Sequence, residues 1–186
     1  FARARNEAED LNLHLEQKVK ERTEELFQAN QQLQQVNTAL EEANYRAQRD
    51  LKMAEFVQKS FYPAFLPPLE GWDVAYAFEP MAGVSGDLYD FYIDENRLLG
   101  AGLFDVSGHG IASGLVAMLA KSVVYRQFMD GKDIPLGEVM KRIDEKLISE
   151  KGNIENYLTG ILLRFTDDRV EYVNAGHPDL LYRSGR

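Results

Sequence analysis

The sequence contains no cysteine, which excludes disulfides, thiolate metal ligands and cysteine nucleophiles. No apolar run approaches the ~20 residues that a membrane-spanning helix needs, and the charged start FARARNEAED is unlike a signal peptide. The net charge of -9 disfavours nucleic acid as a partner, because phosphate contacts supply most of that affinity. Since the chain begins at Phe1 rather than Met, we expect a cytoplasmic fragment of a longer protein. Any tether to the inner face of the membrane would come from upstream segments.

Glycine and proline are both absent from residues 1–60, which are rich in Glu, Gln, Ala, Leu and Lys. These are good helix formers, and apolar residues recur among them with the seven-residue period of a coiled coil. A lone helix of this length cannot bury its apolar stripe, so we expect a homodimer. The alternative is an amphipathic helix that packs on the rest of the chain. In the coiled-coil interpretation, positions a and d hold Val19, Leu26, Leu33, Leu40 and Ala47, and Ala8, Leu15, Ala29, Val36 and Ala43.

The amino-acid composition changes at YPAFLPPLEGW, where three prolines and a glycine end the helix. We therefore divide the chain into a linker, residues 1–60, and a domain, residues 61–186. Strands before and after two helices predict an α+β fold with antiparallel sheets. Because the chain ends just after a strand, the domain looks truncated. The expected strands are 73–80, 88–93, 98–104, 157–165, 169–175 and 179–184, and the expected helices are 111–128 and 135–150.

Two aspartates flank the hairpin that the polar turn DENR predicts between strands 88–93 and 98–104. Asp87 precedes the first strand and Asp105 follows the second, so an antiparallel hairpin brings the two carboxylates together. Like charges that close are unfavourable unless a cation or a proton lies between them, and Mg²⁺ and Mn²⁺ take such oxygen ligands. The pattern favours a metal site about as much as the alternative, in which both aspartates cap turns and helix starts.

The two histidines of the domain, His109 and His177, open a further alternative. With an aspartate they could form a zinc site, but no histidine spacing typical of zinc supports it. His109 is better explained as a loop residue, and NAGHPDLLY as a corner between two strands, in which Asn174 and Gly176 supply the turn conformations.

Four ordered motifs resemble the SpoIIE-type branch of the metal-dependent protein phosphatases, the PPM family: VSGDLYDFY, LFDVSGHGIASGLVAM, LTGILLRF and YVNAGHPDLLYR. AEFVQKSFYPAFLPP resembles the helix and connector that begin these domains, so the resemblance covers about residues 53–186. LEQKVKERTEEL resembles, less specifically, the linkers that join bacterial sensor modules to output domains. The resemblance implies a sandwich of two antiparallel sheets flanked by helices, with Mn²⁺ or Mg²⁺ held by aspartates between the sheets.

The resemblance also implies the site residues. Asp87 and Asp105 match aspartates that bind metal, and Val106 matches a position that binds through its backbone carbonyl. The chain departs from the family in two ways: Ser85 stands where many members have glycine, and the later aspartate motifs of the family lie beyond residue 186. With half of the ligand set, we expect this fragment to bind metal weakly and to be inactive. Supporting positions that the motifs suggest are Gly86, Gly108 and Asp90.

The activity that the resemblance implies is hydrolysis of phosphoserine or phosphothreonine by a metal-activated water. The typical substrate is a phosphorylated anti-sigma-factor antagonist, a small STAS-domain protein, and an upstream sensor domain would regulate the enzyme. Residues 53–66 would couple the linker to the domain. The competing hypothesis is a pseudophosphatase or dimeric signalling module that binds a partner without chemistry.

Overall fold

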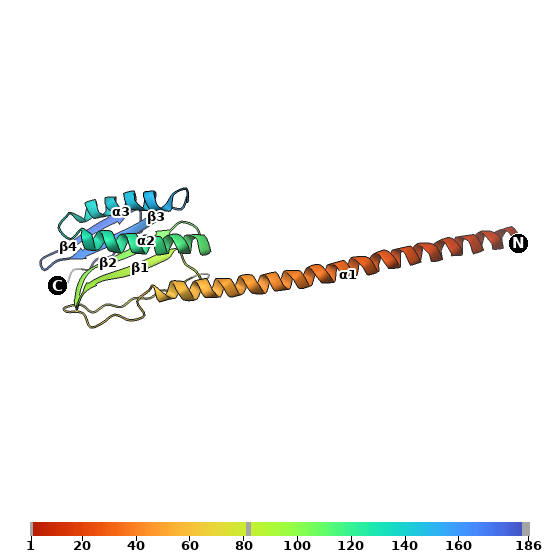
Figure 1. The fold of residues 1–186 in the computed structure, drawn as a ribbon, viewed down its shortest axis with the longest axis horizontal. Coiled ribbons are helices and arrows are strands. Elements are labelled where there is room, and N and C mark those ends of the chain that lie inside the picture. The colour runs from red at the N-terminus through yellow and green to blue at the C-terminus, as the bar shows by residue number, and fades with distance from the viewer. Residues whose placement is uncertain (1, 81–82, 184–186) are drawn as a thin grey trace. The chain divides into compact units, whose positions relative to one another are not determined.

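The computed structural model describes residues 2–80 and 83–183, and its contacts divide the chain into two units, 1–49 and 50–186. Helix α1 (Ala2–Ser60) is one continuous helix, which forms the first unit and enters the second (Figure 1). Its exposed side chains make ion pairs one turn apart, such as Arg5 to Glu9 at 2.9 Å. Pairs of this kind add only a few tenths of a kcal/mol each, so the helix-forming composition is the main local cause of this helix.

The apolar side chains along α1 are exposed among the residues that the structure describes. Leu26 is 70% exposed and Leu33 is 68% exposed, and the other residues expected at position a are exposed as well. A partner helix would bury this stripe, so the dimeric coiled coil stays a prediction. In the described parts of the chain, no helix combines the length and the apolar character that crossing a bilayer requires.

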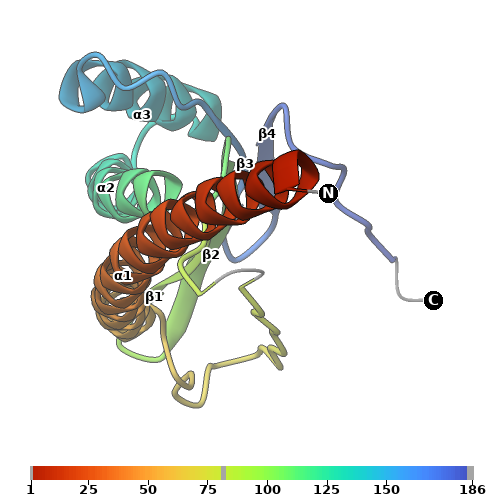
Figure 2. The ribbon, with the colours of Figure 1, turned by 90° about the vertical axis from the view of Figure 1, so that its right-hand side faces the viewer.

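The second unit contains a four-stranded antiparallel sheet in the order β1-β2-β3-β4. The strands β1 and β2 form the predicted hairpin, and helices α2 and α3 follow before β3 and β4. Both helices lie on the same side of the sheet (Figure 2). This arrangement confirms the α+β class. The bounds are β1 Asp87–Asp94, β2 Arg97–Val106, α2 Ile111–Asp130, α3 Leu136–Lys151, β3 Leu158–Phe165 and β4 Val170–Ala175.

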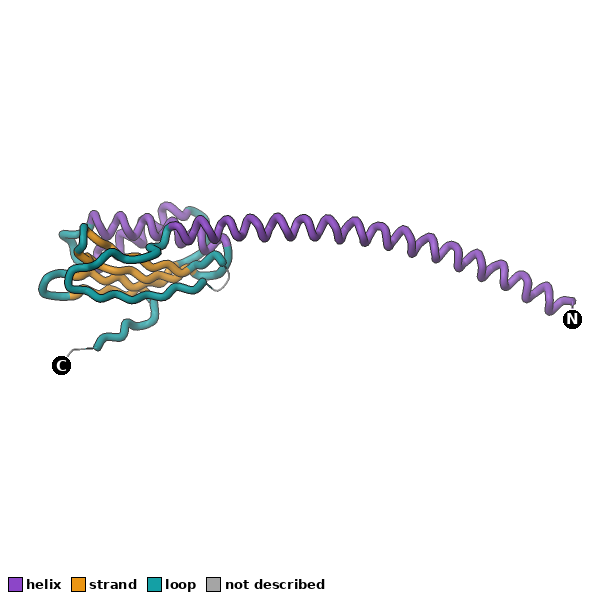
Figure 3. The backbone as a smooth tube through the Cα atoms, turned by 90° about the horizontal axis from the view of Figure 1, so that it is seen from below, coloured by secondary structure: helices purple, strands orange, loops and turns teal. Residues whose placement is uncertain are grey.

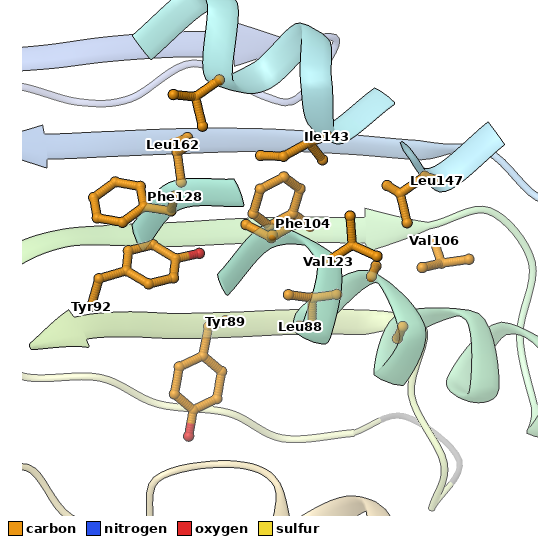
Figure 4. Close-up of a cluster of buried hydrophobic side chains, with 14 of the residues drawn as sticks. Leu88, Tyr89, Tyr92, Phe104, Val106, Val123, Phe128, Ile143, Leu147 and Leu162 are labelled. Carbon is orange, nitrogen blue, oxygen red and sulfur yellow. The ribbon is translucent and has the colours of Figure 1, made fainter. Parts of the chain in front are cut away.

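The core lies between the helices and the sheet face that they cover (Figure 4). Alternate strand residues point into it, because successive side chains in a strand face opposite sides. Each large side chain that is fully buried contributes roughly 1.5–3 kcal/mol, so this layer is what holds β1 and β2 in place. The core includes Leu88, Tyr92, Phe104, Val106 and Leu162 from the sheet and Val123, Phe128, Ile143 and Leu147 from the helices.

The prediction of a strand at 73–80 is wrong. The described residues between α1 and β1 form no helix or strand, apart from an isolated bridge between Leu69 and Trp72 (Figure 3). The alternating pattern has another cause, because Tyr76 and Phe78 place their rings 5.3 Å from the ring of Tyr89 on β1. The alternation of aromatic residues arises here because one side of an extended segment packs on the sheet, although its backbone does not pair with a strand.

The strand expected at 179–184 is also absent from its described part, residues 179–183, while residue 184 lies outside the described residues. Leu181 is 95% exposed and Tyr182 is 86% exposed, so these two side chains are unpacked, and no strand of the described residues pairs with residues 179–183. The described residues form one sheet, where the family resemblance implied two. The sheet face that α2 and α3 leave uncovered is the one that carries Asp87 and Asp105.

Tyr92 offers a test of the core. Its ring stacks on Phe128 with centroids 4.1 Å apart, its side chain is fully buried, and its hydroxyl finds no partner among the residues that the structure describes. A buried hydroxyl without a partner costs about 1–3 kcal/mol. We therefore expect Tyr92→Phe to leave the free energy of unfolding unchanged or to raise it by about 1 kcal/mol in urea denaturation.

The matched control for this substitution is Tyr62→Phe. The Tyr62 hydroxyl donates a hydrogen bond of 2.8 Å to the backbone carbonyl of Asp87, so its loss should lower the free energy of unfolding by about 1 kcal/mol. A loss of more than about 1 kcal/mol in Tyr92→Phe would mean that this hydroxyl has a partner after all.

Candidate metal centre

Asp87 and Asp105 are direct partners in the ladder between β1 and β2. Their neighbours Leu88 and Val106 are buried against the helices, so alternation places both aspartates on the uncovered face. Directly opposed residues on antiparallel strands have Cβ atoms about 4.5–5.5 Å apart. The hairpin therefore brings the two carboxylates together, as its turn predicts.

The pKa of Asp105 is raised in this pair of adjacent acids. Burial raises the pKa of Asp105, and the negative charge of Asp87 and a hydrogen bond between the two side chains raise it further. The charge of His177 acts in the opposite direction and lowers this pKa. Two adjacent carboxylates repel each other unless a proton or a cation lies between them, and a divalent cation relieves this repulsion for both.

Asp87 is held by contacts on both its side chain and its backbone. The Ser85 hydroxyl donates to Oδ2 of Asp87 at 3.2 Å and accepts a hydrogen bond from the backbone N–H of Asp87 at 3.1 Å. The hydroxyl of Tyr62 donates to the backbone carbonyl of the same residue. Serine at position 85, where the family often has glycine, therefore gives the carboxylate an additional hydrogen-bond donor.

The glycine before Asp87 is required by the close approach of two backbone segments. The backbone N–H of Val106 donates to the carbonyl of Gly86 at 3.2 Å, and a Cβ atom at position 86 would lie only 2.7 Å from the Val106 carbonyl oxygen. Any larger residue would displace this carbonyl. The predicted support from Gly86 thus has a steric basis.

The loop after β2 is anchored to the segment before β3. Ser107 donates its backbone N–H to the carbonyl of Tyr157 at 2.8 Å, and its own carbonyl accepts a hydrogen bond of 2.5 Å from the amide of Asn156. Gly108 has a φ of 90°, which a residue with a Cβ rarely adopts. This backbone requirement explains Gly108, while His109 in the same loop is exposed.

Asp90 lies on the other face of β1, away from the carboxylate pair. It forms an ion pair of 2.7 Å with Lys121 of α2, and both side chains are nearly buried. A supporting position was expected from its place in VSGDLYDFY, but alternation along the strand turns its side chain away from the face of Asp87. Its role in the structure is to tie α2 to β1.

Sequence reasoning missed Thr159, and it favoured a turn position for His177 over a zinc site. Thr159 is the direct partner of Asp105 in the ladder between β2 and β3, and its hydroxyl oxygen lies 2.9 Å from Nδ1 of His177. Thr159 lies in the motif LTGILLRF and His177 in the motif YVNAGHPDLLYR. Only the pairing of β3 with β2 shows that these residues come near Asp105.

The donors of this site are carboxylate and carbonyl oxygens, which suit a hard divalent cation such as Mn²⁺ or Mg²⁺. Asp87, Asp105 and the Val106 carbonyl supply donors of this chemistry, and the ladder places the two aspartates opposite each other. Within residues 2–80 and 83–183, however, no three His, Cys, Asp or Glu side chains gather into a group that could hold a metal. The described residues thus supply two acidic side chains to the centre.

Comparison with known proteins points in the same direction. Residues 95–186 match the family Stage II sporulation protein E (SpoIIE). The phosphoserine phosphatase RsbP of Bacillus subtilis is 36% identical over 143 residues, which cover 73% of this chain and 34% of RsbP. The protein IcfG of Synechocystis is 26% identical over 136 residues, covering 70% of this chain and 20% of IcfG.

Among solved structures, the SiaA-PP2C domain of Pseudomonas aeruginosa shares the fold with a TM-score of 0.53 at 19% sequence identity. The likeness covers 66% of this chain and 50% of that domain's chain. This chain thus spans about a third of RsbP, a fifth of IcfG and half of the SiaA domain. From the matched family, the relatives and the shared fold together, the chain belongs to the SpoIIE-type branch of the metal-dependent protein phosphatases.

Proposed function

We propose that this chain is part of a signalling phosphatase that hydrolyses phosphoserine or phosphothreonine in a protein substrate with the help of Mn²⁺ or Mg²⁺. The observation that carries the proposal is the direct opposition of Asp87 and Asp105 in the ladder between β1 and β2. The name of RsbP, a phosphoserine phosphatase, supports the reaction class. The family resemblance favours a phosphorylated STAS-domain anti-sigma-factor antagonist as the substrate.

The residues of this chain have distinct tasks in the proposed reaction. Asp87 and Asp105 hold the cation, Ser85 orients the carboxylate of Asp87, and Gly86 keeps the Val106 carbonyl at the site. The cation, when bound, supplies a water of lowered pKa and neutralises charge on the phosphoryl group. Because only two acidic side chains of the described residues reach the centre, we expect this chain alone to bind the cation weakly and to hydrolyse substrate slowly.

The test is phosphate release from a phosphoserine-bearing STAS protein by the full-length protein in the presence of Mn²⁺. Asp87→Asn should reduce kcat/KM at least about 100-fold, because changes that only touch a ligand's hydrogen-bond partners already cost 10–100-fold. Asp73→Asn, an exposed aspartate of the same domain, is the matched control and should leave the rate unchanged. Release that survives both Asp87→Asn and a chelator would contradict the proposal.

The competing function is a binding module without catalysis, which the small number of acidic ligands among the described residues favours. The same variants separate the two. A module would bind the phosphorylated partner equally well with Asp87→Asn and would release no phosphate in either form.

For regulation, we propose that the end of α1 within residues 53–66 adjusts the metal centre through Gln58. This side chain is only 4% exposed, and its amide N–H donates to the Ser85 carbonyl at 2.7 Å. Its amide oxygen accepts the Ser85 backbone N–H at 2.9 Å. Since Ser85 in turn contacts Asp87, the last turns of α1 lie two hydrogen bonds from a metal ligand.

Helix α2 packs closely against this contact. A Cβ atom at Gly114 of α2 would lie 2.1 Å from a methyl group of Val84 and 3.1 Å from the amide nitrogen of Gln58. Gly114 therefore allows α2, the segment before Asp87 and the end of α1 to meet. We expect a shift of α1 to displace Asp87 through this packing.

Gln58→Ala should lower the Mn²⁺ affinity about tenfold and the free energy of unfolding by about 1–3 kcal/mol, since two buried backbone groups lose their partner. Manganese titration and urea denaturation of the same samples measure the two effects. Gln31→Ala, on the exposed middle of α1, should change neither. Destabilisation with an unchanged Mn²⁺ affinity would show that Gln58 is structural and has no influence on the site.

A further inference from the structure

Three polar side chains form a row across the uncovered face of the sheet. The ladder pairs Asp87 with Asp105, and Asp105 with Thr159. Directly opposed residues point to the same face, so the Thr159 hydroxyl stands next to the Asp105 carboxylate on the side away from Asp87. His177 continues the row, because its Nδ1 lies 2.9 Å from the Thr159 hydroxyl oxygen.

The corner after β4 is built to hold His177 in this place. The backbone N–H of His177 donates to the side-chain oxygen of Asn174 at 2.8 Å, and the Asn174 amide donates back to the His177 carbonyl at 2.9 Å. Gly176 has a φ of 71° and forms a bridge with Gly160, the residue after Thr159. The histidine is half-buried, so its orientation is determined by packing and by hydrogen bonds on both sides.

We infer that His177 is a positioning residue of the metal centre, which donates its Nδ1–H to the Thr159 hydroxyl and thereby directs the Thr159 proton to Asp105. This direction follows once Thr159 donates its proton to Asp105. A hydroxyl has one proton to donate, and an ionised carboxylate can act only as an acceptor. If Thr159 donates to Asp105, its oxygen must accept from His177.

This arrangement gives Asp105 an outer partner as Ser85 gives one to Asp87. Metal-binding carboxylates usually have such partners, which fix the direction of the oxygen that binds the ion. His177 is also close enough for its charge to lower the pKa of Asp105, whereas it belongs to no ligand group of three acids or histidines in the described residues. Its hydrogen bond to this row of side chains is made to Thr159. The inference rests on the proposed metal centre and adds a residue to it.

Manganese binding by this chain tests the inference, with the free Mn²⁺ signal in electron paramagnetic resonance as the readout. We expect His177→Ala and Thr159→Val each to weaken Mn²⁺ binding about tenfold. The double variant should bind no more weakly than either single one, because the two residues act through one path. His177→Asn carries an amide nitrogen near the position of Nδ1 and should restore binding to within about threefold, as should Thr159→Ser. His14→Ala, an exposed histidine of α1, is the control.

The tautomer of His177 gives a readout that a merely structural role would not move. The chain has only three histidines, so single substitutions assign their imidazole ¹⁵N signals. We expect the neutral ring of His177 to carry its proton on Nδ1 and to lose this preference in Thr159→Val. A proton on Nε2, with Nδ1 as an acceptor, would overturn the inference.

The binding results separate two kinds of failure. If Asp105→Asn abolishes Mn²⁺ binding while His177→Ala leaves it within twofold, the metal centre stands and the role of His177 is overturned. That role is overturned as well if His177→Ala weakens binding and neither His177→Asn nor Thr159→Ser restores it. If the unaltered chain shows no saturable Mn²⁺ binding, the proposed centre itself fails, and the inference fails with it.

Discussion

Asp105→Asn is expected to reduce the Mn²⁺ affinity of this chain at least about 100-fold, because it removes one of two acidic ligands. The asparagine retains the size and one oxygen of the side chain, so the β1–β2 hairpin should persist. Asp94→Asn, an exposed carboxylate at the other end of the same hairpin, is the matched control and should bind Mn²⁺ as the unaltered chain does. Titration followed by electron paramagnetic resonance measures both.

In the metal-free chain, we expect the same substitution to stabilise the fold. The folded state raises the pKa of Asp105 above its usual value of 3.8. At pH values between the usual and the raised pKa, the folded state therefore binds more protons than the unfolded state. Stability then falls as pH rises through the raised pKa, and the contribution is most favourable at low pH. Asp105→Asn removes this penalty, so the melting temperature without metal should rise at pH 7 and change less at pH 4.

Together these results would distinguish a metal ligand from a structural acid. An Asp105→Asn chain that is less stable at pH 7 without metal would show that the ionised carboxylate has stabilising partners. An affinity for Mn²⁺ within a few-fold of the unaltered chain would remove Asp105 from the centre. Either result would contradict the arrangement of two opposed carboxylates that require a cation.

Arg164→Ala is expected to lower the free energy of unfolding by about 3–5 kcal/mol, since it breaks a buried charge network by removing one partner. Arg164 is 8% exposed and donates to the carbonyls of Ile134 at 2.7 Å and Gly131 at 2.9 Å. It also forms an ion pair of 3.2 Å with Glu171. These bonds join the connection between α2 and α3 to the sheet.

Lysine cannot replace this arginine, because a single ammonium group lacks the planar fork that reaches two carbonyls and a carboxylate. Arg164→Lys should therefore recover less than half of the loss. Arg169→Ala is the matched control: Arg169 pairs with the same Glu171 at 3.5 Å but is 67% exposed on its side chain, and such pairs contribute about 0–1 kcal/mol. Urea denaturation measures all three, and a loss below about 1 kcal/mol in Arg164→Ala would contradict a stabilising role for this buried network.

Local features of the chain were readable without the structure. The absence of glycine and proline predicts α1, and the polar turn DENR predicts the hairpin that opposes Asp87 and Asp105. Both depend on residues close together in the sequence, where turn geometry and helix propensity limit the backbone to few conformations. The amphipathic pattern of α3 was readable for the same reason.

Other features depended on contacts between distant segments. Residues 73–80 have the alternation of a strand, yet no strand of the described residues pairs with them, and the rings of Tyr76 and Phe78 pack on the sheet instead. Asp90 shares a motif with Asp87, yet lies on the opposite face and pairs with Lys121. In both cases the pattern of residue types was correctly seen, but its meaning depended on which surface was nearby.

The sequence by itself determined the helix, the hairpin and the pair of aspartates, since short-range turn and helix preferences specify them. The tertiary structure decided which groups complete the surroundings of that pair. Thr159 and His177 reach Asp105 only through the pairing of β2 with β3 across two intervening helices, and Gln58 reaches Ser85 only through the packing of α1. Burial of the common core sets these long-range pairings, and no local preference encodes them.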